Sequence, residues 1–373
     1  MSKKEASFRV LTEEIINNGQ CASCGACVGL CPYLTLYQGA IVFPDACALE
    51  RGRCLHYCPK GPLDLNELAR QAWKTPYEGL PAGPMRKIVM ARAKTPPEGV
   101  QYGGVVSTLI LTILKEKGFN GTLLTQWKGR DYPAGIIVRN SEEIAIHTGV
   151  HYAGAYSLAA LNGHRKSDPG PIAVVGLPCQ ILAMRRMHTF DHPENLHYGA
   201  DDLLIGLFCT WALSPRPFHA EMKRRFGDRE ILRYDIPPPP ANRFDVFFTD
   251  GKKVEIPLED IRPFINPGCH TCLDMTAEFA DISVGAAEGF PGWNTVIVRT
   301  ERGAAFFDRL VETGKLETQD LPETSLAHLI EAAAAKKKRA LKTLSEKKDV
   351  TDWLGLSPQV QESIMNSNST GGS

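Results

Sequence analysis

The feature that most constrains this chain is a run of closely spaced cysteines near its start. Cys21, Cys24, Cys27 and Cys31 are followed by Pro32, which gives the spacing C-x2-C-x2-C-x3-C-P. In bacterial ferredoxins this spacing places three thiolates around one iron–sulfur cluster, and the fourth ligates a neighbouring cluster. Zinc sites favour two well-separated pairs of ligands, so zinc and a coincidental cysteine-rich turn are the weaker interpretations.

The second half of the ferredoxin pattern is present but altered. Cys54 and Cys58-Pro59 repeat the closing C-x3-C-P, but Arg51 stands three residues before Cys54, and Cys47 lies seven residues before it. Three outcomes stay open for a second cluster: a 4Fe-4S cluster with a non-cysteine ligand, a 3Fe-4S cluster, or no cluster. We favour the presence of a second cluster.

The crossover of the fourth cysteine divides the seven N-terminal cysteines between two clusters. The first cluster is expected to take Cys21, Cys24, Cys27 and Cys58. The second is expected to take Cys31, Cys47 and Cys54, which leaves it one thiolate short. The candidates for its missing ligand are Asp45, Glu50 and His56.

Composition limits the function classes. The chain has 373 residues and 11 cysteines, and without an export signal metal ligation explains so many cysteines better than disulfides do. Lys+Arg and Asp+Glu both total 42, and this balance argues against a nucleic-acid partner. No apolar run approaches the roughly 20 residues of a membrane span. We therefore expect a cytoplasmic protein.

Beyond the cysteine-rich segment the pattern is that of an α/β protein. We expect a ferredoxin-like α+β domain over 1–75, a linker over 76–84, a mixed-sheet α/β core with flanking helices over 85–347, and a partly disordered tail over 348–373. Core strands are predicted at 87–91, 122–125, 135–138, 171–176 and 203–209, with a β-rich stretch at 231–257. Helices are predicted at 105–117, from Gln180 onward, and at 325–347.

Four further cysteines lie in the predicted core. Cys179 and Cys209 each come at the end of a predicted strand, and Cys269 and Cys272 form a C-x2-C pair. Four thiolates suffice for one iron–sulfur cluster or one tetrahedral zinc ion, and their spacing does not choose between the two. Buried, unrelated cysteines and a redox dithiol are the other interpretations.

Iron–sulfur clusters move single electrons and need a partner that supplies or accepts them. The chain contains neither G-x-G-x-x-G after a strand nor G-x4-G-K-[ST], so nicotinamide binding at a Rossmann site and nucleotide hydrolysis lack support. Flavin is the natural converter between two-electron and one-electron chemistry. The turn from Gln101 to Ser107 enters a helix and could seat flavin phosphates, or it could be a Gly-Gly loop without a ligand.

The order of several motifs resembles the family of beta subunits of coenzyme F420 hydrogenase and dehydrogenase. The resemblance covers about residues 85–315, and an N-terminal ferredoxin segment is a common attachment in that family. The motifs that carry it are Gln101-Tyr102-Gly103-Gly104-Val105-Val106, Gly176-Leu177-Pro178-Cys179-Gln180, Cys269-His270-Thr271-Cys272-Leu273-Asp274, the segment 277–285, and the segment 292–300.

The resemblance implies an FAD-binding core with its own 4Fe-4S cluster on Cys179, Cys209, Cys269 and Cys272, and therefore two or three clusters in all. The flavin contacts that it implies are Gln101, Gly103, Gly104, Val105, Ser107, His151 and Tyr152. His151 is also the candidate for a catalytic hydrogen-bond or proton donor. The pair His151-Tyr152 departs from the family pattern, where a Lys-Tyr pair is expected.

We therefore expect an electron-transfer subunit with FAD chemistry at one end and 4Fe-4S clusters leading to a partner. The partner would be a hydrogenase, formate dehydrogenase or heterodisulfide-reductase-like subunit, or ferredoxin, and a deazaflavin coenzyme is a possible substrate. The alternatives are a stand-alone, ferredoxin-fed reductase of a small organic substrate and a zinc-stabilised interaction module without redox activity.

Overall fold

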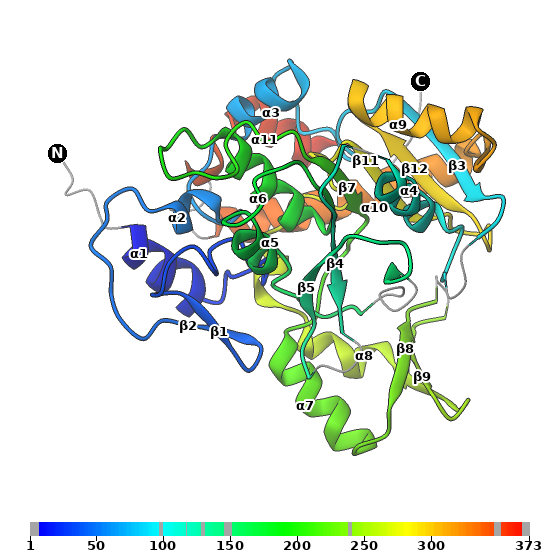
Figure 1. The fold of residues 1–373 in the computed structure, drawn as a ribbon, viewed down its shortest axis with the longest axis horizontal. Helices are drawn as coiled ribbons and strands as arrows, with labels where there is room; N and C mark the ends of the chain where they lie inside the picture. Colours follow the sequence, from blue (N-terminus) through cyan, green and yellow to red (C-terminus); the bar gives the residue numbers. More distant parts are fainter. Residues whose placement is uncertain are drawn as a thin grey trace.

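The computed structural model describes residues 7–96, 100–116, 118–127, 131–144, 151–237, 241–346 and 352–367. Its centre is an eight-stranded mixed sheet with the spatial order β13-β3-β12-β11-β7-β6-β4-β5 (Figure 1). In chain order the strands are β3 Lys87–Ala93, β4 Thr122–Gln126, β5 Ala134–Val138, β6 Ala173–Gly176, β7 Leu203–Leu207, β11 Ile282–Ala286, β12 Asn294–Val298 and β13 Leu316–Gln319.

The middle of the sheet is parallel and its two sides are antiparallel. β4, β6, β7 and β11 run in one direction, whereas β5 pairs antiparallel with β4, and β12, β3 and β13 follow β11 in antiparallel pairs. Ala173 and Val174 of β6 are completely buried, as expected of a parallel strand that is covered on both faces. The carboxyl ends of the four parallel strands meet at one edge, where open α/β sheets bind ligands.

Helices cover both faces of the sheet. On one face α4 (Val105–Lys115) and α9 (Glu301–Glu312) bury Leu109, Ile113 and Phe307 against the strands. The opposite face is covered mainly by α6, whose Ile181 and Met184 are completely buried. The helices on this side of the molecule are α3 Leu65–Trp73, α5 Leu158–His164, α6 Pro178–Thr189, α10 Glu323–Ser345 and α11 Pro358–Asn366.

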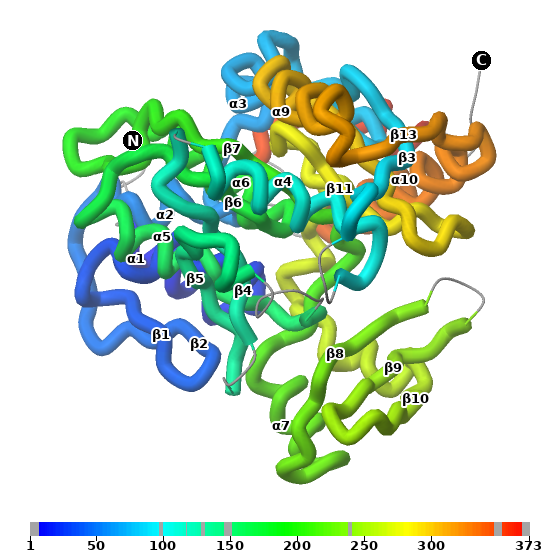
Figure 2. The backbone as a smooth tube through the Cα atoms, turned by 45° about the vertical axis from the view of Figure 1, so that its right-hand side comes forward, coloured from blue at the N-terminus to red at the C-terminus, as the bar shows by residue number. Residues whose placement is uncertain are grey.

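A small antiparallel lobe extends from the main body beside the central sheet (Figure 2). Its strands pair in the order β10-β9-β8, and its core contains Phe218, Tyr234 and Phe244. The elements of the lobe are α7 Pro215–Phe226, β8 Ile231–Asp235, β9 Arg243–Phe248, β10 Lys253–Pro257, α8 Leu258–Ile261 and η3 Arg262–Phe264. The prediction of a β-rich stretch over 231–257 is therefore confirmed.

The cysteine-rich segment packs against α5 and α6. Asn162 of α5 donates hydrogen bonds from Nδ2 to the carbonyls of Ala26 (2.9 Å) and Val28 (2.7 Å). The elements of the segment are α1 Ser7–Arg9, which continues as the π-type helix η1 Val10–Asn17, the hairpin β1 Thr35–Tyr37 and β2 Ala40–Val42, and α2 Arg53–Tyr57. Its assignment to the ferredoxin fold stays a prediction.

The predicted core elements are present, with small shifts of their bounds. The helix predicted from Gln180 begins at Pro178 instead, because proline lacks the N–H that a first helical position leaves unpaired anyway. This shift places Cys179 in the first turn of α6. The helix predicted over 105–117 ends at Lys115, and residue 117 lies outside the described residues.

The predicted linker and tail are partly packed onto the core. Within 76–84, Tyr77 and Ala82 are buried. In the C-terminal segment, Ile364 of α11 is buried and Leu63 donates a backbone hydrogen bond of 2.5 Å to the carbonyl of Trp353. Within the tail over 348–373 that was predicted to be partly disordered, residues 348–351 and 368–373 lie outside the described residues. Across the ranges that are described, no helix combines the length and apolar character needed to cross a membrane.

Candidate functional site: a cavity with thiol groups behind it

A cavity of about 760 Å³ lies at the carboxyl edge of the parallel strands. All four of these strands line it at or just beyond their carboxyl ends, through Thr125, Gly176, Phe208 and Gly285. Asn294 joins them because β12 runs antiparallel to β11 and begins where β11 ends. The volume falls within the range of about 300–1,000 Å³ that is typical of small-molecule and cofactor sites.

Helix α4 begins at the cavity wall. Gly104 is its N-cap residue and has a φ of 72°, a left-handed conformation that glycine adopts without a steric cost. The Val105 amide donates to Asn294 Oδ1 at 3.4 Å, and Asn294 Nδ2 donates to the Gly285 carbonyl at 3.0 Å. Ser107, in the first turn, lines the cavity. The free N–H groups and the dipole of such a turn favour an anionic group.

Helix α6 also begins at this cavity. The turn between β6 and α6 is fixed by Gln180, whose Oε1 accepts a hydrogen bond of 2.8 Å from the Leu177 amide. Gln180 is buried, and both residues line the cavity. The cavity is therefore bordered by the amino termini of two helices, each of which attracts negative charge.

The β8–β10 lobe closes a further side of the cavity. Gln101 Nε2 donates to the Tyr234 carbonyl at 3.0 Å, and Tyr102 Oη donates to Asp235 Oδ1 at 3.2 Å. Tyr152 Oη accepts a hydrogen bond of 3.0 Å from the amide of Ile236. Burial and then the nearby Asp235 carboxylate raise the pKa of Tyr102 to about 12, so this phenol stays protonated at neutral pH.

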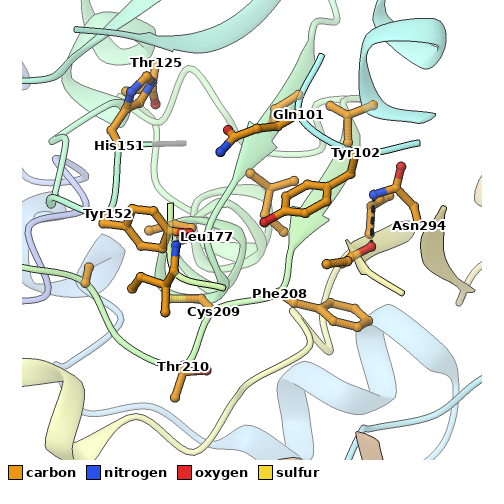
Figure 3. Close-up of a pocket in the computed structure, with 18 of the residues that line it drawn as sticks. Gln101, Tyr102, Thr125, His151, Tyr152, Leu177, Phe208, Cys209, Thr210 and Asn294 are labelled. Carbon is orange, nitrogen blue, oxygen red and sulfur yellow. Dashed lines mark hydrogen bonds between the residues drawn. The ribbon is translucent and has the colours of Figure 1, made fainter. Parts of the chain in front are cut away.

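Most of the predicted flavin contacts line this cavity. Figure 3 shows Gln101 and Tyr102 across from His151 and Tyr152, with Cys209 below them. The predicted contacts among the lining residues are Gln101, Gly104, Val105, Ser107, His151 and Tyr152. Gly103 lies behind the wall, where a Cβ would come within 2.9 Å of the Ala91 carbonyl. The His151 ring lies 5.7 Å from that of Trp127, and its catalytic role stays a prediction.

Several lining residues were not predicted to contact the cofactor. Asn294 and Gln180 stand inside motifs that carry the family resemblance, so those motifs held a signal for them. Thr210 and Arg262 also line the cavity. Thr210 follows Cys209, which was predicted to lie at a strand end, whereas Arg262 comes from the lobe and has no motif around it.

The four cysteines of the core come together beside this cavity. Cys179 lies in α6, Cys209 follows β7, and Cys269 and Cys272 lie in and just after the 3-10 helix η4 Pro267–Thr271. The Cys179 thiol interacts electrostatically with the other three. Burial and the neighbouring thiols raise the pKa of Cys209 to about 12, despite an opposing effect of Lys336. We call Cys179, Cys209, Cys269 and Cys272 the core quartet.

Cys21, Cys24, Cys27 and Cys58 also gather, as the crossover rule predicts. Cys27 interacts electrostatically with the other three, and burial raises the pKa of Cys21 to about 11. Gly25 adopts a φ of 86°, and a side chain there would collide with the backbone of Tyr156. Glycine at this position therefore allows the cysteine loop to pack tightly on the core. We call these four cysteines the first N-terminal group.

The second N-terminal group consists of Cys31, Cys47 and Cys54. The Cys54 thiol interacts with those of Cys31 and Cys47, and the largest charge effects on it come from cysteines rather than from a candidate fourth ligand. Burial, followed by the nearby Arg186 and Arg51, lowers the pKa of His56 to about 4. The three candidate ligands have other surroundings: His56 stacks on Phe190 at 4.0 Å, Asp45 accepts a hydrogen bond from the Ala46 amide, and Glu50 is exposed.

The cavity and the three thiol groups are contiguous. Cys209 belongs to both the cavity wall and the core quartet. Cys179 interacts with Cys24 of the first N-terminal group and lies 4.0 Å from the Ala22 carbonyl. Cys54 interacts with Cys58, which connects the first N-terminal group to the second. In the part of the chain that is described, no three Cys, His, Asp or Glu side chains are placed to hold a single metal ion.

Buried charged groups lie in the core close to Asp274, which follows Cys272 by two residues. Lys337 of α10 donates to Glu278 Oε1 at 2.5 Å and to Tyr77 Oη at 2.9 Å. Arg299 donates to the carbonyls of Ala82 (2.9 Å) and Pro84 (2.7 Å), so it fixes the predicted linker to the core. These groups therefore stabilise the folded core.

The fold and the site define a class: α/β proteins in which a large mixed sheet carries a cofactor-sized cavity, here with cysteine thiols in its wall. The chain belongs to the family of coenzyme F420 hydrogenase/dehydrogenase beta subunits. The N-terminal profile of that family matches residues 88–162, and the C-terminal profile matches residues 170–324. The two matches contain every element of the cavity wall and all four cysteines of the core quartet.

Three curated relatives illustrate the range of the family. One component of the F420H2 dehydrogenase of Methanosarcina mazei is 29% identical over 84% of this chain and 88% of its own length. The coenzyme F420 hydrogenase beta chain of Methanococcus voltae is 28% identical over 65% of this chain and 88% of its own. The coenzyme F420-dependent sulfite reductase of Methanocaldococcus jannaschii is 28% identical over 78% of this chain, which spans 46% of that relative.

A solved structure shares the fold. A chain of the F420-reducing NiFe hydrogenase complex from Methanosarcina barkeri superimposes with a TM-score of 0.65 at 24% identity. The match covers 72% of this chain and 94% of that one. At this level of identity the likeness supports the arrangement of the sheet and its flanking helices.

Proposed function

We propose that this chain is an electron-transfer subunit of an oxidoreductase, with FAD in the cavity and iron–sulfur clusters on the thiol groups. The observation that carries the proposal is the position of Cys209, which belongs both to the cavity wall and to the core quartet. FAD, when bound, would supply the exchange between two-electron and one-electron chemistry. The chain itself supplies an uninterrupted series of sites from the cavity to the second N-terminal group.

The volume of the cavity and the two helix amino termini in its wall support FAD as the cofactor. The amino termini of α4 and α6 would bind the pyrophosphate, with Val105 and Ser107 in the first turn of α4. Apolar side chains such as Leu124 and Val175 would exclude water from the bound cofactor. Asn294 would hold the start of α4 in place through its bond to the Val105 amide.

The thiol groups fit iron–sulfur clusters in their ligand chemistry. Thiolates are soft ligands that select iron–sulfur clusters, zinc and copper(I). Burial raises the pKa of Cys21, Cys209 and Cys54, so these thiols would lose their protons when they bind a metal centre. The first N-terminal group and the core quartet would each hold one 4Fe-4S cluster. The second N-terminal group would hold a cluster with one non-cysteine ligand or a 3Fe-4S cluster.

The names of the relatives suggest the substrate and the partner. The hydrogenase, dehydrogenase and sulfite reductase relatives all use coenzyme F420 by name, so we propose this deazaflavin as the two-electron substrate. His151, in the cavity wall, would donate a hydrogen bond or proton to it. The partner would be another redox subunit that exchanges electrons at the second N-terminal group, where the loop around Cys47 is exposed.

The proposal is tested by anaerobic purification followed by iron, sulfide and flavin analysis and titration with reduced coenzyme F420 and with NADH. Three 4Fe-4S clusters would give about 12 irons per FAD, and loss of the second N-terminal cluster would give about 8. Reduced F420, but not NADH, should bleach the flavin and cluster absorbance. A colourless protein that contains zinc would establish the interaction-module alternative, and turnover of an organic substrate with reduced ferredoxin alone would establish the stand-alone reductase.

A further inference from the structure

Helix α10 carries a buried ammonium group beside the core quartet. Lys336 is 4% exposed, and its Nζ donates hydrogen bonds of 2.7 Å to the carbonyls of Cys209 and Asp274. Both acceptors are uncharged. Among the side chains that the structure describes, no carboxylate oxygen lies within 4.0 Å of this nitrogen.

A buried ammonium needs a compensating negative charge, because two carbonyl groups do not replace the hydration that it loses. Lys336 Nζ contacts the backbone of Cys209 itself and of Asp274, which follows Cys272 by two residues. In the proposed function the quartet binds a cluster through thiolates, which would place negative charge beside this ammonium group.

The adjacent lysine shows how different this arrangement is. Lys337 is 1% exposed and forms an ion pair with Glu278, so its charge is balanced by a carboxylate. Lys336 forms no such ion pair with any described residue. The negative charge that balances its ammonium group would therefore be that of the metal centre on the core quartet. The charge of Lys336 consequently interacts with the oxidation state of that centre.

We propose that Lys336 sets the reduction potential of the core centre; this inference rests on the proposed function, in which the quartet binds a 4Fe-4S cluster. With FAD in the cavity and a cluster on the quartet, one electron passed from reduced flavin would oxidise the flavin by one electron and make the cluster more negative by one charge. A fixed positive charge nearby would stabilise that reduced cluster. Lys336 keeps all of its protons, and no bond to it forms or breaks.

The position of Lys336 places this effect at the entry point for electrons. Its Nζ is hydrogen-bonded to the backbone of Cys209, the quartet member that also lines the cavity. A higher potential at this centre favours transfer from the cavity cofactor to the quartet. Lys336 is a positioning residue in this proposal, because it contacts a ligand backbone and neither the substrate nor the flavin.

The test is an anaerobic redox titration of the full-length holoprotein, followed by electron paramagnetic resonance. The variants are Lys336→Met and Lys336→Gln, which remove the charge, Lys336→Arg, which keeps it, and Lys338→Met as a matched control. Lys338 lies two positions further along α10, on a different face of the helix. Lys336→Met and Lys336→Gln should each lower the reduced-to-oxidised ratio of one cluster about tenfold at a given ambient potential, a shift of about 59 mV for one electron.

The other clusters should keep their potentials in every variant, and both Lys336→Arg and Lys338→Met should match the unmodified protein. The inference is overturned if Lys336→Met and Lys336→Gln leave every potential unchanged in protein with a full iron content. If neither neutral variant assembles the core centre, Lys336→Arg decides: assembly with the unmodified potential supports a role of the charge, and failure to assemble shows that the role is packing. Unmodified protein without iron and sulfide would defeat the proposed function itself, before any variant is compared.

Discussion

The first N-terminal group and the core quartet each gather four cysteines, but the chain assembles them in different ways. Three cysteines of the N-terminal group stand on one turn, from Cys21 to Cys27. The core quartet draws on the start of α6, the end of β7 and the helix η4. A local turn positions the first set, whereas only the folded sheet edge brings the second together. Assembly of the core quartet therefore requires that the whole α/β core is folded.

The surroundings of the two groups differ as well. Lys336 of α10 is buried and donates to the carbonyl of Cys209 in the core quartet. Beside the first N-terminal group lies Arg186 of α6, which donates to the Cys58 carbonyl and, at 3.1 Å, to the Gly61 carbonyl. A buried ammonium group thus contacts the backbone of the core quartet, whereas a buried guanidinium group holds the backbone of the segment that carries Cys58.

The largest expected effect separates the two groups directly. Cys272→Ser should remove the core cluster and stop electron transfer from the cavity to the N-terminal clusters, whereas Cys24→Ser should leave transfer from the cavity to the core quartet intact. Each change should remove about four of about 12 irons. Rapid mixing with reduced F420, read by cluster absorbance, checks both. Continued reduction of the N-terminal clusters in the Cys272→Ser protein would contradict the series of sites proposed here.

The next largest effect is expected from a substitution of Arg186, which connects α6 of the core to the segment around Cys58. Arg186 is 7% exposed and also donates to the Pro62 carbonyl at 2.7 Å, so Arg186→Met would remove one donor from each of the carbonyls of Cys58, Gly61 and Pro62. We expect unfolding to become easier by about 3 kcal/mol, with faster hydrogen exchange in residues 52–62. Arg339→Met, an exposed change on α10, serves as the control and should stay within about 0.5 kcal/mol. Unchanged exchange in residues 52–62 would show that Arg186 does not hold this segment.

The same contrast explains how much could be predicted from the sequence. The N-terminal cysteines are close in sequence, so their spacing predicts how they divide into groups, and the Cys27 thiol interacts with those of Cys21, Cys24 and Cys58. Strands such as β6 and β7 were predictable because parallel strands buried on both faces form continuous apolar runs. The turn at Gly104 was predictable because a Gly-Gly pair precedes an apolar helix.

What could not be predicted depends on contacts between distant segments. Asn294 reaches the start of α4 only because β12 begins at the edge where β11 ends. Lys336 sits in a lysine-rich stretch that is typical of a solvated helix face, and its burial depends on how α10 packs beside η4. Arg262 enters the cavity wall from the lobe. Hydrophobic periodicity and motif spacing carry no information about contacts between segments that are distant in the sequence.

A smaller effect is expected at the incomplete second N-terminal group. Cys47→Ser should remove at most about four irons and should leave reduction of the core quartet by reduced F420 unchanged, because Cys47 lies at the far end of the series of sites. Electron transfer to the partner should be slowed. Iron analysis and the same rapid-mixing experiment check these outcomes, with Cys24→Ser as the reference. An unchanged iron content would show that Cys31, Cys47 and Cys54 hold no cluster.

The smallest expected effect is a pH dependence of the stability of the core, which comes from the buried Glu278. Burial raises the pKa of Glu278 to about 7 from an ordinary value of 4.5, against the opposing effect of Lys337. Between these two values the folded protein holds a proton that the unfolded chain releases, so stability should fall as pH rises through this window. The slope attributable to this group is at most about 1.4 kcal/mol per pH unit.

Denaturant unfolding between pH 5 and 8 measures this slope. Glu278→Gln should flatten it, because the amide cannot release a proton, whereas Glu331→Gln, at an exposed position of α10, should leave it unchanged. Above about pH 7, where Glu278 is ionised, Glu278→Gln also leaves Lys337 without its carboxylate, so the loss of stability relative to the unmodified protein should be largest there. Equal slopes in the unmodified protein and in Glu278→Gln would assign the pH dependence to other groups. The buried Lys336 would then be the remaining charged group by which the surroundings of the core quartet differ from those of the first N-terminal group.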